Sequence, residues 1–101
     1  MSTRIQFHEA ARDEFREAAR WYEREREGLG SEFFVAVEGA LERAARGEIP
    51  GLAGERGATK KIVLQRFPYV LHFETDDVGL YVWAVAHGRR RPGYWRDRAR
   101  T

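Results

Sequence analysis

The residues best suited to chemistry lie near the C-terminal end of the chain, between positions 87 and 96. This segment reads HGRRRPGYWR, so guanidinium groups stand beside two aromatic rings. Arginine side chains bind phosphate groups through paired hydrogen bonds, and tyrosine or tryptophan rings stack on nucleotide bases. The composition therefore suits contact with nucleic acid. The sequence favours a simpler interpretation, in which Trp95 packs on a sheet as core while the arginines stay in water.

Two histidines and a tyrosine are candidate proton-transfer groups. An imidazole at His87, where a strand gives way to the arginine-rich segment, could act as a base near neutral pH. It could equally fix the turn through a hydrogen bond to the backbone, which the sequence favours. His72 is expected on a strand, partly exposed, on the face opposite Leu71. Tyr94 would need a pKa lowered by the neighbouring arginines to act as a base.

Charge is divided unevenly along the chain. Residues 1–58 carry a net charge of −3, residues 59–101 carry +5, and the last fifteen residues contain six arginines and one acid. This asymmetry indicates an anionic partner for the C-terminal half, either nucleic acid or an acidic protein. The alternative is a compositional bias of the genome, since the chain uses sixteen arginines and only two lysines.

Length and composition exclude several classes of protein. The 101 residues, 43% of them hydrophobic, suit a single globular domain over 1–101 with a basic C-terminal segment at 87–101. The absence of cysteine excludes disulfides, iron–sulfur clusters and thiolate zinc sites, and three histidines without a paired spacing argue against a metal enzyme. We expect no metal and no cofactor. With no signal peptide and no apolar run of membrane-spanning length, we expect a soluble cytoplasmic protein.

Hydrophobic spacing predicts a pair of helices. Apolar residues three and four apart predict a first helix over residues 9–27, capped at its C-terminal end by Gly28. Ser31 is a suitable N-cap for a second helix, which Gly47 and Pro50 end. The short break between the two makes them an antiparallel hairpin.

The hairpin also carries apolar residues that are difficult to bury. Gly39, in the middle of the second helix, costs up to about 1 kcal/mol relative to alanine, and close approach of the first helix would explain it. Either Phe33 or Phe34 can fill the core. Trp21 then lies one position outside the main apolar stripe, and Leu29 lies at the hairpin tip. Exposed apolar groups of this kind mark interaction sites.

The remaining pattern has a period of two and predicts strands. Residues 3–7 suit an N-terminal strand, and residues 47–59 read as a mobile loop. Residues 62–64, 69–74 and 80–86 form three strands joined by short turns, an antiparallel meander. The order β-α-α-β-β-β predicts an α+β fold, a two-layer sandwich with the helical hairpin on one face of a small sheet.

Five short motifs follow one another along this framework. They are Trp21-Tyr22, Gly28-Leu29-Gly30 with Phe33, Arg66-Phe67-Pro68-Tyr69, His87-Gly88-Arg89-Arg90, and Pro92 with Trp95. From about Ile5 to Arg96 this order resembles the RelE/ParE superfamily of bacterial type II toxins, and it is closest to the ParE side. The resemblance implies a growth-arresting, plasmid-stabilization type of toxin. It also implies an antitoxin, encoded beside the toxin, that wraps and silences it.

The superfamily contains two unlike activities. ParE-type members poison DNA gyrase by binding to it, and this is the function we expect here. Target contact would then involve the basic end of the chain, through Arg89, Arg90, Arg91, Trp95 and Arg96. The antitoxin, expected to be a small acidic protein with a DNA-binding N-terminus, would fold along the hairpin and contact Trp21 and Leu29.

The alternative is a RelE-like endoribonuclease that cuts mRNA on the ribosome. Lys61 and Arg90 match the basic residues of that family, but Val63 and Val70 stand where further basic residues are expected. Losing a phosphate-stabilising cation typically costs several kcal/mol in the transition state, which favours binding over cleavage. The catalytic set of this alternative is Lys61, Arg90, His87 and Tyr94. A third possibility is a degenerate toxin that serves only as a structural or DNA-autoregulation partner.

Overall fold

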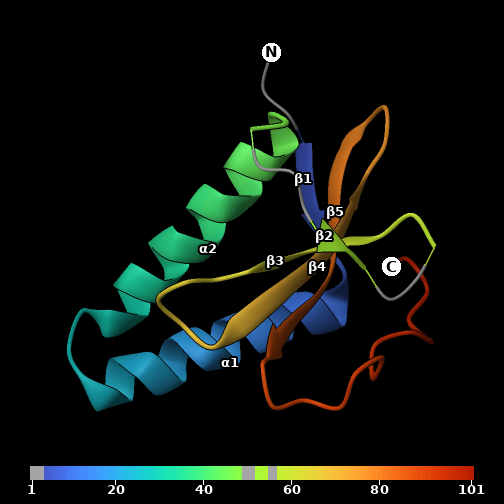
Figure 1. Cartoon of the computed structure of the whole chain (residues 1–101). Helices are drawn as coiled ribbons and strands as arrows, with labels where there is room; N and C mark the ends of the chain where they lie inside the picture. Colours follow the sequence, from blue (N-terminus) through green and yellow to red (C-terminus); the bar gives the residue numbers. More distant parts are fainter. Residues whose placement is uncertain (1–3, 49–51, 55–56) are drawn as a thin grey trace.

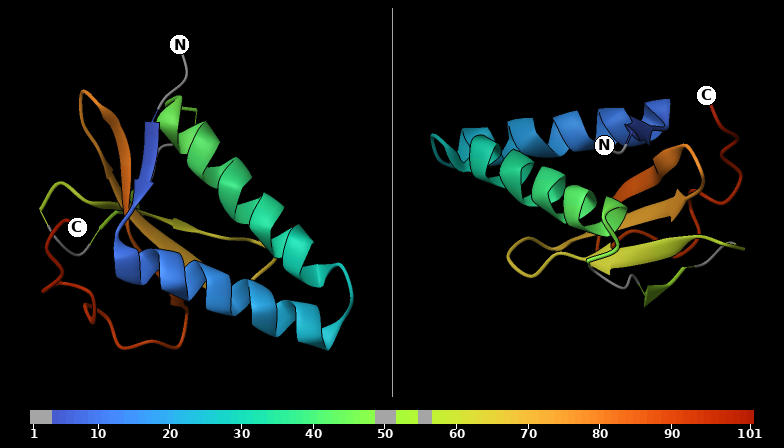
Figure 2. Two further views of the ribbon diagram at one scale, coloured as in Figure 1. Left: turned by 180° about the vertical axis from the view of Figure 1, so that it is seen from behind. Right: turned by 90° about the horizontal axis from the view of Figure 1, so that it is seen from above.

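The elements follow the order that the sequence predicts. The computed structural model describes residues 4–48, 52–54 and 57–101. The elements are β1 (Arg4–Phe7), α1 (Glu9–Glu25), α2 (Leu29–Ala45), β2 (Leu52–Ala53), β3 (Lys60–Val63), β4 (Tyr69–Thr75) and β5 (Gly79–His87). The predicted α+β order is confirmed, with the two-residue strand β2 added to it. Both helices lie in one layer over the sheet (Figures 1 and 2).

The five strands form one sheet in the order β1-β5-β4-β3-β2. β3, β4 and β5 are an antiparallel meander, whereas β1 runs parallel to β5 at the edge of the sheet. The parallel pairing extends over four residues and ends with Phe7 opposite Val82. Among the described residues, no strand lies beside the remainder of β5 on that side.

A bulge in β5 divides its side chains between the two faces of the sheet. His72 pairs with Ala84 and the next residue, Phe73, pairs with Val82, so Trp83 is an extra residue. Trp83 and Ala84 consequently belong to a small cluster on the face away from the helices. The face toward the helices joins the main core, with Leu71, Phe73, Leu80, Val82 and Val85.

Both helices cover this core, and the buried residues of α1 have the spacing that the sequence predicts. Four of its residues are buried as expected: Ala11, Phe15, Ala18 and Tyr22. In α2 the choice between two phenylalanines is settled, since Phe33 is fully buried and Phe34 is 50% exposed. The ring of Phe34 still stacks on that of Phe15, at 5.1 Å between centroids.

The hairpin turn differs from the prediction by a few residues. α1 ends at Glu25, and Gly28 is the N-cap of α2 rather than the C-cap of α1. Its φ of 87° lies in the left-handed region, which glycine adopts without strain. Ser31 is inside α2 and not its N-cap. The Glu23 carboxylate caps the start of α2 in place of Ser31. It accepts hydrogen bonds from the backbone N–H groups of Gly28 and Gly30, both at 3.0 Å.

Two further expectations concern the ends of elements. Thr3 and Pro50, predicted to begin the first strand and to end the second helix, lie outside the described residues. The described part of the predicted 47–59 loop contains β2, which pairs with Lys60 and Lys61 of β3. Neither helix in the described part of the chain has the length and apolar character needed to cross a membrane.

Two glycines of α2 give opposite predictions for stability. A Cβ on Gly30 would lie 2.6 Å from the backbone oxygen of Ala19, so the close approach of the helices expected at Gly39 occurs at Gly30 instead. Gly30→Ala should therefore lower the free energy of unfolding by about 2 kcal/mol. A Cβ on Gly39 would meet only a guanidinium nitrogen of Arg43, at 3.6 Å. Gly39→Ala should raise the free energy of unfolding by up to about 1 kcal/mol. Urea denaturation of both variants tests the pair, and destabilisation by Gly39→Ala would contradict it.

Candidate functional site

A small cavity of about 170 Å³ opens beside the arginine-rich segment. Its lining comes from β3, β4, the end of β5 and residues 88–95. All four residues of the endoribonuclease alternative line this one cavity: Lys61, His87, Arg90 and Tyr94. The fold thus brings together groups that the sequence places on separate elements.

The charge of the cavity lining is positive, but it does not complete the cation pattern of a RelE-type nuclease. Among the described residues, the cationic side chains that line it are Lys61, Arg90 and Arg91. Val70 also lines it, where a RelE-type site would present a cation. Val63 pairs with Val70 across β3 and β4 and is exposed. The site can therefore bind an anion, with less charge than the nuclease pattern requires.

His87 has the structural role that the sequence favours. Its Nδ1 accepts a hydrogen bond from the backbone N–H of Arg89 at 3.0 Å, which fixes the turn after β5. Its ring meets that of Tyr69 edge to face, at 5.3 Å between centroids. Because Nδ1 accepts this hydrogen bond, the neutral ring carries its proton on Nε2, which can donate a proton but cannot act as a base.

His72 lies on the predicted face of the sheet but is not partly exposed. It is buried because the ring of Trp95 covers it, at 4.8 Å between centroids. Trp95 itself has no exposed surface and also stacks over Trp83 at 6.3 Å. The core role of Trp95 is confirmed. In this conformation the fully buried ring presents no surface to a partner, so the expected target contact of Trp95 would require the ring to leave the sheet.

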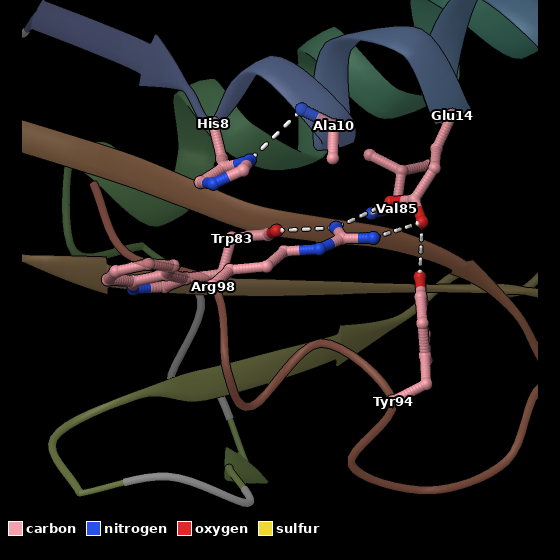
Figure 3. Close-up of polar contacts among 7 residues, drawn as sticks. All are labelled: His8, Ala10, Glu14, Trp83, Val85, Tyr94 and Arg98. Carbon is pink, nitrogen blue, oxygen red and sulfur yellow. Dashed lines mark hydrogen bonds and ion pairs between the residues drawn. The ribbon is translucent and has the colours of Figure 1, made fainter. Parts of the chain in front are cut away.

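A polar network ties the same segment to the first helix (Figure 3). Glu14 Oε2 accepts hydrogen bonds from the Tyr94 hydroxyl at 2.7 Å and from Arg98 Nη2 at 2.8 Å. Glu14 Oε1 accepts from Arg98 Nη1 and from the backbone N–H of Val85, both at 3.1 Å. Arg98 Nη1 also donates to the carbonyl of Trp83 at 3.0 Å. Residues distant in the chain are thereby joined at one carboxylate.

Sequence reasoning missed Glu14 as a key residue. It stands among the many charges of α1, most of which are exposed. The available signal was its position, three residues after Ala11 and four before Ala18 on the buried stripe. A carboxylate there is half-buried and needs partners.

Tyr94 is not suited to act as a base. Burial raises the pKa of its hydroxyl well above the ordinary value of 10, and the hydrogen bond to Glu14 raises it further. The charges of Arg98 and Arg90 lower that pKa but do not overcome these effects. The lowered pKa that catalysis by Tyr94 would require is therefore the opposite of what the structure has.

The six arginines of residues 87–101 fall into two groups. Arg98 and Arg100 are engaged by the fold, Arg98 with Glu14 and Arg100 with Asp76 at 3.4 Å. The other four are exposed: Arg89, Arg90, Arg91 and Arg96. The guanidinium carbon of Arg90 lies 3.9 Å from the centroid of the Tyr94 ring. The positive charge is thus partly structural and partly available to an anionic partner.

The two hairpin residues expected to contact an antitoxin differ in exposure. Trp21 is 50% exposed and meets the ring of Tyr22 edge to face. Leu29 is half-buried and packs against the main core, because α2 begins at this residue rather than at Ser31. Phe34 and Val35 are exposed instead and line a shallow apolar hollow between the helices.

Comparison with known proteins adds no assignment. The chain matches no protein-family model, and a search of curated proteins found no match either. Within the described residues, no group of three or more histidines and acids is placed to hold a metal ion.

The raised pKa of Tyr94 gives a prediction for alkaline pH. Because the folded pKa lies above the unfolded value, the neutral phenol stabilises the fold fully below pH 10, and this contribution is lost as the pH rises beyond 10. Tyr94→Phe should make the free energy of unfolding fall less steeply above pH 10. Part of the decline should remain, since burial also raises the pKa of Tyr22 and Tyr69. Urea denaturation across this pH range provides the measurement, and identical slopes for the two proteins would rule the prediction out.

Proposed function

We propose that this protein is the toxin of a type II toxin–antitoxin pair and acts in the cytoplasm by binding DNA gyrase. The observation that carries the proposal is the set of four exposed arginines on a segment anchored at both ends. His87 fixes the start of the segment, and Trp95 with Arg98 fixes its end. A pre-ordered cationic surface loses little conformational entropy when it meets an acidic or phosphate-bearing partner.

Binding is favoured over cleavage by the state of the candidate catalytic groups. Tyr94 is committed to Glu14, and its raised pKa removes it as a base at neutral pH. Val63 and Val70 supply no charge to stabilise a pentavalent phosphate. A surface that binds without catalysing is consistent with all of these features.

Cleavage of mRNA on the ribosome remains the second candidate because of one observation. Lys61, His87 and Arg90 share a single cavity. In-line attack by a 2′-hydroxyl needs a base, a cation and a proton source. Lys61 and Arg90 would supply the cations and the Nε2–H group of His87 the proton, so this set lacks a base for the 2′-hydroxyl.

Removing the exposed positive charge tests whether these arginines bind a target or only reflect a compositional bias of the genome. We expect glutamine at all four of Arg89, Arg90, Arg91 and Arg96 to abolish growth arrest and inhibition of gyrase supercoiling. The fold should survive, since surface substitutions change stability by less than about 0.5 kcal/mol each. The matched control places glutamine at the four exposed arginines of α1: Arg12, Arg16, Arg20 and Arg24. This control removes the same charge and should retain activity.

Lys61→Ala, assayed beside these proteins, distinguishes the two candidates. Toxicity that persists without the four arginines would show that they do not bind the target and that their number reflects the composition of the genome. Cuts in ribosome-bound mRNA that disappear in Lys61→Ala would favour the endoribonuclease instead. Gyrase inhibition unaffected by Lys61→Ala would support binding.

We also propose that the antitoxin contacts the helical hairpin, on which the side chains of Trp21, Phe34 and Val35 are exposed. A few large residues usually dominate such interfaces. Trp21→Ala should weaken binding of the protein encoded beside this one by at least about 1–2 kcal/mol, without lowering the melting temperature. Calorimetric titration and thermal melts measure the two effects. Glu17→Ala, at an exposed position of the same helix, is the control.

Leu29 no longer serves as a test of this interface. Its side chain packs on the main core, so Leu29→Asp should lower stability as well as any affinity. A large drop in the melting temperature of Trp21→Ala, with unchanged affinity for the antitoxin, would show that Trp21 also belongs to the core. The antitoxin interface would then lie elsewhere.

A further inference from the structure

The parallel strand β1 covers less than half of the strand it pairs with. β1 has four residues and β5 has nine, and the last parallel pair joins Phe7 to Val82. The chain then enters α1, whose N-cap His8 donates its backbone N–H to the carbonyl of Val82 at 2.9 Å. From Trp83 onward, β5 is an edge strand on this side.

Two side chains from opposite ends of the chain cover this edge (Figure 3). Glu14 accepts a hydrogen bond from the backbone N–H of Val85, and Arg98 donates one to the carbonyl of Trp83. The two side chains also pair with each other and are only 20% and 17% exposed. The Glu14–Arg98 pair therefore takes the place that further residues of β1 would occupy.

The contacts of Glu14 continue to the cavity through Tyr94. The Tyr94 hydroxyl donates to Glu14, and the Tyr94 ring lies against the guanidinium group of Arg90. The guanidinium carbon of Arg98 lies on the same ring, 5.1 Å from its centroid. Glu14 is thus in contact with Tyr94, and Tyr94 in turn with Arg90.

We propose that Glu14 is the positioning residue of the arginine-rich segment. By holding Val85, Tyr94 and Arg98 together, it fixes residues 88–98 in the conformation that presents the exposed arginines. This inference rests on the proposed function only in taking those arginines as the surface that binds the target. Glu14 itself touches no target.

The network lies outside the main core, so the positioning role of Glu14 can be distinguished from a contribution to the stability of the whole fold. The main core contains neither Glu14 nor any residue of the C-terminal segment. In Glu14→Gln the half-buried guanidinium of Arg98 loses its counter-charge, and the one remaining amide oxygen cannot accept from Val85, Tyr94 and Arg98 as the two carboxylate oxygens do. The cost falls on the segment and the β5 edge, so we expect a local opening rather than global unfolding.

Hydrogen exchange of the free protein tests the positioning role. The backbone N–H groups of Tyr94, Arg96 and Arg98 donate to carbonyls within the segment. In Glu14→Gln these three amides should exchange at least about tenfold faster, while amides of α2 and β4 keep their rates. Glu17→Gln, which removes the same charge from an exposed position of α1, should change neither set. The pKa of Tyr94 should also fall in Glu14→Gln and not in the control.

Tyr94→Phe keeps the test decisive if Glu14→Gln fails to fold. It removes one hydrogen bond of the network and leaves the Glu14–Arg98 pair, so a smaller acceleration of the same amides is expected. Unchanged exchange in the segment, or equal acceleration over the whole chain, would overturn the proposal. Full gyrase inhibition by a folded Glu14→Gln protein would also overturn it. Failure of the unmodified protein to inhibit gyrase would count against the proposed function alone, since exchange needs no target.

Discussion

The shortness of β1 is the constraint on which the second half of the structure depends. A strand edge presents backbone donors and acceptors that must find partners in the protein or in water. Beyond Val82 the edge of β5 is met by side chains, and the Glu14–Arg98 pair satisfies both a donor and an acceptor there. That solution requires the C-terminal segment to return to α1. The route of residues 88–101 thus supplies Arg98 to the edge that β1 leaves uncovered.

The bulge in β5 makes the same route possible on the other face of the sheet. It turns both Trp83 and Ala84 away from the helices, which creates an apolar surface opposite the main core. Trp95 fills this surface and covers His72. The segment is thus held by an apolar contact and by a charged one, and the exposed arginines lie between or beside these anchors. Rigid support of a charged loop is the feature that links this fold to the proposed binding function.

In this cavity, the protonation and hydrogen bonding of the candidate residues say more about catalysis than their closeness does. Four candidate catalytic side chains meet in one place, yet Tyr94 is held neutral by burial and by Glu14. The Nδ1 atom of His87 is occupied by the turn that it fixes. These contacts support the proposal of binding over cleavage. The same interactions that order the segment reduce the ability of its residues to transfer protons.

The sequence by itself determined the order of elements and the inward face of α1, because hydrophobic spacing depends only on local helix and strand geometry. It also indicated the packing of Trp95 and the turn-fixing role of His87. The tertiary structure decided between Phe33 and Phe34, placed the close helix approach at Gly30 instead of Gly39, and packed the half-buried Leu29 against the main core. It alone showed the role of Glu14, whose partners lie 71, 80 and 84 residues away. A local pattern shows that a half-buried carboxylate needs partners, but only the folded chain brings them within hydrogen-bond distance.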